Sequence, residues 1–240
     1  MMEIEFFGVR GSVPVSSKDT TLFGGSTSSV LVTNRQGNQL ILDSGTGIIV
    51  IGDLLVKNES PIVILLTHNH WDHIQGFPFF RPIYQEGREI TIIPGQVNSN
   101  DKDVVLKQMS GSTHPVKYQE LPANINLLIE ESAKSSFEIP GFTVETKLLN
   151  HPDGGTAYAI YADNKKLCYV TDNELVPPYE CTTSWQEWAQ FISNADLLIH
   201  DGQYIDSDLP VKHGWGHSTN AQVCLLAKQS QVKRLAIISH

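Results

Sequence analysis

The feature that most constrains this chain is a dense group of imidazole and carboxylate side chains directly after an apolar run. Residues 61–66 read Pro-Ile-Val-Ile-Leu-Leu, which predicts a short strand buried on both faces. The next segment contains His68, His70, Asp72 and His73. With only 9 histidines in 240 residues, this density favours a functional site over a polar loop with chance histidines. Imidazole and carboxylate are the usual ligands of zinc and its first-row neighbours, so the pattern predicts a metal site.

The spacing within this group indicates how the backbone must run. On a helix, residues two apart point in different directions, whereas in an extended segment they point to the same side. His68 and His70 can therefore bind one metal only if the chain is extended there, as the end of a strand implies. If the chain then turns, Asp72 and His73 can reach a second metal alongside the first.

One segment cannot complete two metal sites, so further ligands must come from elsewhere. Side chains that follow apolar strands are the best candidates, because strand ends leave the core where such groups converge. His151 follows a predicted strand at 142–149, Asp172 follows one at 166–171, and His240 follows one at 235–239. Each residue alone could belong to a surface loop, but the shared placement favours a ligand set.

The hydrophobic pattern along the rest of the chain predicts an α/β protein. We expect further strands at 3–9, 28–33, 39–43, 89–93, 156–162 and 196–199, and helices near 48–57, 101–109, 183–193 and 219–230. Residues 95–136 are mostly polar and could cover a site. The strands come in two batches, each followed by helices, which suggests two packed sheets with helices outside. No linker or repeat divides the chain, so we expect a single domain over residues 1–240.

Composition narrows the function classes. The formal net charge of −9 and the pI of about 5.4 disfavour binding along an extended phosphate backbone, although a small anion in a locally positive pocket remains compatible. Three cysteines without a CxxC pair argue against a disulfide framework and for a reducing compartment. The acidic start is unlike a signal peptide, and no apolar run is long enough to span a bilayer, so a cytoplasmic protein is expected.

These motifs carry a resemblance to a known family. The chain resembles metallo-β-lactamase-fold hydrolases, because the segment from His68 to His73 matches their HxHxDH motif and Asp43 matches an aspartate placed upstream of it. It looks closest to the branch of tRNA 3′-processing endonucleases and cyclic phosphodiesterases, on the segments Phe7–Ser12, Gly24–Ser28 and Gly214–Thr219. The resemblance runs across nearly the whole chain. It implies a four-layer αββα sandwich of two mixed sheets flanked by helices, but the motif specifies substrate only weakly.

The resemblance also implies a ligand set for two divalent metal ions. His68, His70 and His151 would hold one metal, Asp72, His73 and His240 would hold the other, and Asp172 would bridge them. Zinc is the first expectation, and manganese or iron would fit the same donors. Such metals lower the pKa of bound water, so the predicted reaction is attack by hydroxide on phosphorus, with Asp72 and Asp172 in the catalytic centre.

Other polar residues are expected to support this chemistry. His217 is the candidate proton donor to the leaving oxygen, because histidine titrates near neutral pH. Ser218 and Thr219 resemble a helix N-cap whose N–H groups would favour a phosphate. Asp43 is expected to orient the metal loop through hydrogen bonds. His200 and Asp201 could support His217 or the metals, and an ordinary hydrogen-bonded pair at a strand end is an equal alternative. His114 and His213 are expected to be surface histidines, with contact to substrate as the less favoured alternative. Five aromatic residues could line a substrate pocket, although core packing is the expected role of most: Trp71, Phe77, Phe79, Phe80 and Trp215.

The preferred interpretation is a metal-dependent phosphodiesterase for a small or cyclic phosphate ester. The alternatives are a tRNA 3′-processing endonuclease, a hydrolase of lactones, thioesters or β-lactams, and a metal-stabilised binding or sensor module. The net charge and the lack of an evident basic, Gly/Pro-rich arm argue against tRNA, so nucleic acid is a disfavoured but open substrate. No membrane partner is expected, and a homodimer is left open.

Overall fold

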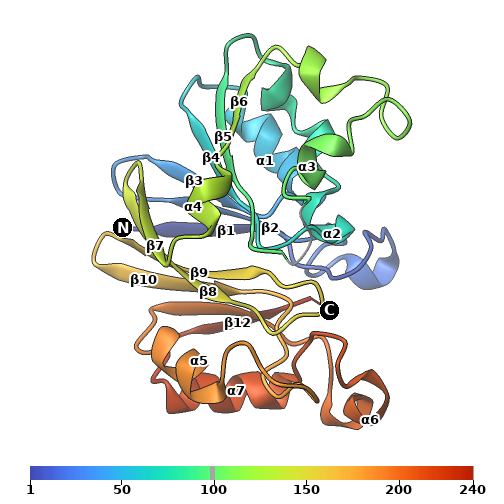
Figure 1. The fold of residues 1–240 in the computed structure, drawn as a ribbon. Helices are drawn as coiled ribbons and strands as arrows, with labels where there is room; N and C mark the ends of the chain where they lie inside the picture. The colour runs from blue at the N-terminus through green and yellow to red at the C-terminus, as the bar shows by residue number, and fades with distance from the viewer. Residues whose placement is uncertain (98–100, 240) are drawn as a thin grey trace. The chain divides into compact units, whose positions relative to one another are not determined.

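The structure is a computed structural model that describes residues 1–97 and 101–239. The chain forms two compact units. We call Glu3–Ala133 the N-terminal unit, and Lys134–His240 together with Met1–Met2 the C-terminal unit. Each unit is built on its own six-stranded sheet (Figure 1).

The sheet of the N-terminal unit follows chain order from β1 to β6. Its first three strands pair antiparallel, and from β3 onward all neighbours are parallel. The strands are β1 (Glu3–Gly8), β2 (Ser29–Thr33), β3 (Gln39–Leu42), β4 (Ile62–Leu65), β5 (Glu89–Ile93) and β6 (Asn124–Leu127). All four residues of β4 are buried, as its uninterrupted apolar sequence predicts.

Helices and short turns cover this sheet and create the core of the unit. In α1 (Ile48–Leu55) the buried positions are Ile48, Ile51, Gly52 and Leu55, which is the spacing of one helix face. They pack with Ile41 and Ile64 of the strands in one apolar cluster. The other helical segments are α2 (Trp71–Ile74), α3 (Val104–Lys107), α4 (Ile129–Ser132) and the 3-10 turns η1 (Lys18–Thr20), η2 (Phe77–Phe79), η3 (Arg81–Tyr84) and η4 (Tyr118–Glu120).

The sheet of the C-terminal unit is also ordered along the chain, from β7 to β12. Here β7 to β10 pair antiparallel, and β10, β11 and β12 are parallel. The strands are β7 (Ser136–Ile139), β8 (Phe142–Leu148), β9 (Thr156–Ala162), β10 (Lys165–Val170), β11 (Leu197–Asp201) and β12 (Leu235–Ile238).

Two capped helices cover one face of this second sheet (Figure 1). Ser184 caps α5 (Trp185–Phe191) and Thr219 caps α7 (Asn220–Gln229), each through a capping box. Trp188 of α5 is fully buried and joins the apolar cluster beneath the helices. The remaining helical segments are η5 (Asp206–Asp208) and α6 (Leu209–Lys212).

The α/β class is confirmed, with two mixed sheets and flanking helices. Two strands were not predicted, β6 and β7, and each lies at one edge of its sheet. Outer strands carry little apolar signal, and β6 reads Asn-Ile-Asn-Leu with no fully buried residue. The single domain over residues 1–240 stays a prediction. Among the residues that the structure describes, no helix is long and apolar enough to cross a membrane.

Candidate metal centre

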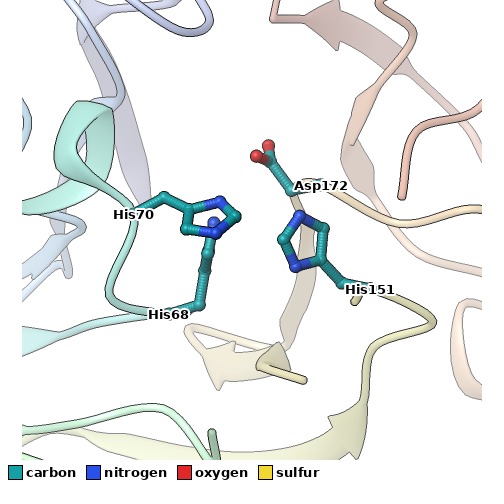
Figure 2. A group of neighbouring side chains, drawn as sticks. All are labelled: His68, His70, His151 and Asp172. Atoms are coloured by element: carbon teal, nitrogen blue, oxygen red, sulfur yellow. The ribbon is translucent and has the colours of Figure 1, made fainter. Parts of the chain in front are cut away.

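The loop after β4 has the predicted backbone. The chain stays extended through His70, whose φ of −63° and ψ of 149° precede α2. His68 and His70 thus bring their ligand atoms within 4.8 Å of each other, and their ring centroids are 4.6 Å apart (Figure 2). His68 is fully buried. Two imidazoles on one side of an extended segment are the arrangement that a shared metal requires.

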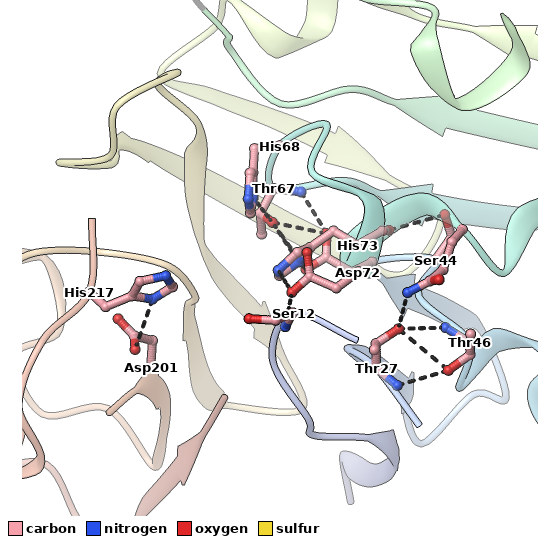
Figure 3. Close-up of polar contacts among 12 residues, drawn as sticks. Ser12, Thr27, Ser44, Thr46, Thr67, His68, Asp72, His73, Asp201 and His217 are labelled. Atoms are coloured by element: carbon pink, nitrogen blue, oxygen red, sulfur yellow. Dashed lines mark hydrogen bonds and ion pairs between the residues drawn. The ribbon is translucent and has the colours of Figure 1, made fainter. Parts of the chain in front are cut away.

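The chain then turns into α2, which presents Asp72 and His73. The Asp72 Oδ2 atom lies 3.5 Å from His73 Nε2. It also accepts a hydrogen bond of 2.8 Å from the backbone N–H of Ser12 (Figure 3). Ser12 belongs to one of the segments that carry the family resemblance, but its contact with Asp72 was not predicted. The residue type of Ser12 could not predict this hydrogen bond, because every residue except proline has a backbone N–H.

Asp43 holds this loop from behind. Its Oδ1 atom accepts a hydrogen bond of 2.7 Å from the backbone N–H of Thr67. The Thr67 hydroxyl donates a second hydrogen bond, of 3.0 Å, to the same carboxylate. The other oxygen, Oδ2, lies 2.8 Å from Nδ1 of His73. A carboxylate can only accept, so Nδ1 carries the hydrogen and Nε2 carries the lone pair that a metal needs. The expected hydrogen bonds from Asp43 to the metal loop are therefore present. Asp43 is fully buried and has a φ of 58°, a left-handed conformation that aspartate tolerates.

In the C-terminal unit, His151 and Asp172 lie together. Each follows a strand, β8 or β10, and each is buried. Their ligand atoms are within 4.8 Å of each other (Figure 2). Asp172 has a φ of 49°, so the chain turns sharply at the residue that carries the carboxylate.

A second buried carboxylate, Asp201, organises the loops of the C-terminal unit. Its Oδ2 accepts 3.1 Å hydrogen bonds from the backbone N–H groups of Asn173 and Ser218. Its Oδ1 accepts one of 3.0 Å from the N–H of Gln203 and lies 3.3 Å from Nδ1 of His217 (Figure 3). Asp201 thus supports His217, one of the two roles expected for it.

Glu174 was missed by the sequence analysis. This buried carboxylate accepts hydrogen bonds of 2.9 and 3.0 Å from the backbone N–H groups of Gly214 and Gly216. A side chain at Gly216 would overlap the ring of His151, and its φ of +87° also favours glycine. The Gly-Trp-Gly spacing was the available signal, because paired glycines often mark a close backbone approach.

Other predicted residues have more local surroundings. Thr219 is the helix cap and accepts from the N–H of Gln222, whereas Ser218 donates to the Asn173 carbonyl and accepts from the Leu175 N–H. Both hydroxyls are fully buried, so their contact with substrate stays a prediction. His200 is fully buried in β11, where burial lowers the pKa of its imidazole.

The aromatic residues divide into two groups. Core packing was expected for most of these five residues, which is wrong, because only Phe77 and Phe80 of the five are buried. Trp71, Phe79 and Trp215 are exposed instead. Of the two remaining histidines, His213 lies 2.8 Å from the Val176 carbonyl through Nε2, and His114 lies 3.0 Å from the Val116 carbonyl through Nδ1.

The donors fit divalent metal ions. The N-terminal unit supplies three imidazoles and one carboxylate within six residues, and the C-terminal unit supplies an adjacent imidazole–carboxylate pair. Mixed nitrogen and oxygen donors of this kind suit zinc and its first-row neighbours. His240 lies outside the described residues. All three cysteines lie within them and are free thiols.

Comparison with known proteins identifies the class. The family model described as "Beta-lactamase superfamily domain" matches residues 43–240, so the chain belongs to this superfamily. The expected class, a metallo-β-lactamase-fold hydrolase close to the tRNA 3′-processing and phosphodiesterase branch, is confirmed.

Particular relatives can then be named. The chain is similar to ribonuclease Z of Halalkalibacterium halodurans, with 27% identity over 288 aligned positions that cover 100% of this chain and 87% of that protein. It shares its fold with the metallo-β-lactamase fold protein YhfI of Bacillus subtilis, at a TM-score of 0.68 and 17% identity, covering 99% of this chain and 86% of the other. It also shares it with the short form of human tRNase Z, at a TM-score of 0.66 and 21% identity, covering 100% and 92%.

Proposed function

We propose that this protein is a metal-dependent phosphodiester hydrolase that cleaves RNA, with a tRNA precursor as the leading candidate substrate. The observation that carries the proposal is the similarity to ribonuclease Z over the full length of the chain. This shifts the preference from a small or cyclic phosphate ester, the first interpretation of the sequence, to the endonuclease that stood as its alternative.

The proposed metal centre uses the ligand set that the family resemblance implies. His68, His70 and His151 would hold one ion, and Asp72 and His73 the other, with Asp172 shared and His240 as a further donor. A divalent metal supplies Lewis-acid polarisation of the phosphate and lowers the pKa of bound water. Zinc is the metal we propose, because histidine and aspartate are its usual ligands in open catalytic sites.

His217 is proposed to give a proton to the leaving oxygen. Its Nδ1 faces Asp201, so Nε2 is the nitrogen that would meet substrate. Its side chain is 15% exposed, in contrast to the fully buried ring of His73. Asp201 would stabilise the imidazolium form and fix the orientation of the ring, as an acid catalyst requires.

A second candidate is a small phosphate ester, and two observations favour it. The net charge of −9 opposes a long polyanion. The 288 positions aligned with ribonuclease Z also exceed the 240 residues of this chain by 48, so at least that many positions have no counterpart here. We further propose a cytoplasmic location, which the three free cysteines support.

A substrate panel tests the proposal. The enzyme, loaded with zinc or manganese, is offered a tRNA precursor with a 3′ extension, a generic aryl phosphodiester, cyclic nucleotides, cyclic sugar phosphates, a chromogenic β-lactam and a lactone. We expect cleavage of the precursor and the aryl diester alone. Cleavage confined to cyclic or small esters would select the second candidate, and hydrolysis confined to the β-lactam or lactone would overturn both. His217→Ala should lower turnover while elemental analysis finds the metal content unchanged.

A further inference from the structure

A hollow lies beside the metal loop within the N-terminal unit. Its volume is about 570 Å³, and it is bounded by α2 and the turn after it on one side and by α3 and the following segment on the other. The lining residues fall into an aromatic group (Trp71, Phe79, His114), an amide and hydroxyl group (Gln75, Gln108, Ser110, Thr113), and Pro78, Val104 and Lys107. None of the metal-loop ligands lines it, but Trp71 stands between His70 and Asp72 in the chain.

The aromatic side chains of this hollow face solvent. Trp71 is 72% exposed and Phe79 is 57% exposed. Phe77 and Phe80, on either side of Phe79 in the chain, are fully buried, so the exposure of Trp71 and Phe79 is not a general property of this segment. The ring of His114 meets that of Phe79 edge-on at 5.7 Å. Exposed flat rings around a hollow suit another flat ring, which would stack on them.

Charge argues against phosphate as the group bound in the hollow. Lys107 is its only cationic side chain among the lining residues. Its Nζ lies 2.8 Å from an Asp101 oxygen and 2.9 Å from an Asp103 oxygen, so two carboxylates surround one ammonium group. The hollow therefore has no excess positive charge to attract an anion.

The polar groups of the rim suit the edge of a base. The Gln108 amide nitrogen donates to the carbonyls of Ile74 and Val105, which fixes the amide orientation. The Thr113 hydroxyl donates to the Gln108 carbonyl. Because their hydrogens are used in these bonds, the Gln108 side-chain oxygen and the Thr113 hydroxyl oxygen are oriented as acceptors, which can bind the N–H groups of an uncharged heterocycle.

We propose that this hollow binds a nucleobase of the substrate, stacked on Trp71 and Phe79, next to the phosphate that the metal loop addresses. The inference rests on the proposed function and adds a base-binding subsite to it. Trp71 is the link, because the residue that offers the stacking face is adjacent in the chain to two predicted metal ligands. The site would select nucleotides over base-free phosphate esters of equal charge.

Calorimetric titration of the metal-loaded protein with nucleoside monophosphates, and with ribose 5-phosphate as the base-free match, tests this subsite. We expect the nucleotides to bind and ribose 5-phosphate to bind at least tenfold more weakly. Trp71→Ala should weaken nucleotide binding roughly 5- to 100-fold, as the loss of one stacked base does. Trp71→Phe should retain most of the binding, because it keeps an aromatic face. Phe23→Ala is the matched control, since Phe23 is 76% exposed in the same unit but does not line the hollow.

Phe79→Leu guards against an indirect effect of Trp71 on the metal loop. This variant keeps an apolar side chain and lies in the turn after α2, outside the segment from His68 to His73, so it should weaken nucleotide binding with metal content unchanged. Equal affinity for nucleotides and ribose 5-phosphate, or wild-type binding by both Trp71→Ala and Phe79→Leu, would overturn the subsite. If nucleotide binding by Trp71→Ala and Phe79→Leu is unchanged and both variants cleave RNA at the wild-type rate, the base-binding subsite is wrong but the proposed function is not. If nucleotides bind through Trp71 but RNA is not cleaved, the subsite stands and the proposed function fails.

Discussion

Both units contain a buried aspartate next to a histidine, but the distance between the two side chains and the burial of the histidine differ. Each places a fully buried aspartate behind a histidine and ties the neighbouring loops to that aspartate through backbone N–H groups. In the N-terminal unit, Asp43 lies 2.8 Å from a His73 ring that is fully buried. In the C-terminal unit, Asp201 lies 3.3 Å from a His217 ring whose side chain is 15% exposed.

This difference matches the two roles proposed for the histidines. A metal ligand must be held in one tautomer and one position, which a short buried hydrogen bond achieves. A proton donor must meet the substrate, so it needs an oriented ring that is not enclosed. The comparison therefore predicts that equivalent changes at the two aspartates will have different consequences.

The largest effect is expected from Asp43→Asn. The amide nitrogen would donate to His73 Nδ1 and reverse its tautomer, so Nε2 would carry a hydrogen in place of the lone pair for the metal. We expect loss of at least one metal ion by elemental analysis and destabilisation by about 3 kcal/mol or more in urea unfolding, because buried donors lose a charged acceptor. Full metal content in this variant would contradict the role assigned to Asp43.

Asp201→Asn is the matched change in the other unit. We expect turnover to fall about 100-fold, because His217 would lose the partner that stabilises its protonated form, while metal content stays at the wild-type level. Steady-state kinetics and elemental analysis on the same preparation measure both. If Asp43→Asn and Asp201→Asn lose metal equally, the contrast between the two units is wrong.

A smaller effect is expected from Gly216→Ala. The added methyl group would overlap the His151 ring, so we expect metal affinity to fall about 10- to 100-fold in a chelator competition assay. Gly214→Ala is the control, because Gly214 has a similar φ of +90° but only Pro178 atoms nearby, the nearer at 3.2 Å. Both variants should lose roughly 1–2 kcal/mol of stability from backbone strain, but only Gly216→Ala should lose metal affinity.

The smallest effect concerns a carboxylate paired with lysines, Asp196. Burial alone would raise its pKa, but hydrogen bonds from Lys233, Lys165 and the Lys166 backbone outweigh burial and hold the pKa well below its usual range. A depressed folded-state pKa stabilises the protein above the unfolded-state pKa of about 4, and this stabilisation is lost as pH falls towards the folded-state value.

Asp196→Asn should therefore cost about 1–2 kcal/mol at pH 7, and the gap to wild type should narrow in acid. Urea unfolding of the metal-free proteins at pH 7 and in acid measures this difference in stability. We expect the variant to bind metal as the wild type does. Asp53→Asn removes an exposed ion pair with Arg81 and should change stability by less than about 0.5 kcal/mol. A constant gap for Asp196→Asn at all pH values would refute the assigned cause.

The parts of the fold that could be predicted are those that depend on a short continuous stretch of sequence. The run of apolar residues in β4 predicts a buried strand, and the alternation from His68 to His70 predicts the extended loop end that the structure has. The hydrogen bond between Asp201 and His217 was one of two expected roles for Asp201. These residues have side chains whose chemistry is specific enough to suggest a partner.

The unpredicted parts depend on contacts between a side chain and a distant backbone. Glu174 binds N–H groups 40 and 42 residues away, and Ser12 donates to Asp72 across 60 residues. Every residue except proline has such an N–H, so composition gives no hint of the pairing. The sequence offered five aromatic residues that could line a substrate pocket, but it did not indicate that Trp71 and Phe79 are exposed while Phe77 and Phe80 are buried, because this difference depends on tertiary packing.

The strict chain order of the strands bears on how the protein forms during synthesis. Every strand pairs with its neighbour in the chain and within its own unit, so each sheet can form from its own stretch of sequence. Domains assemble from the amino end as the ribosome advances. We therefore expect the histidine-rich loop to take shape on its own sheet while the C-terminal unit is still being synthesised.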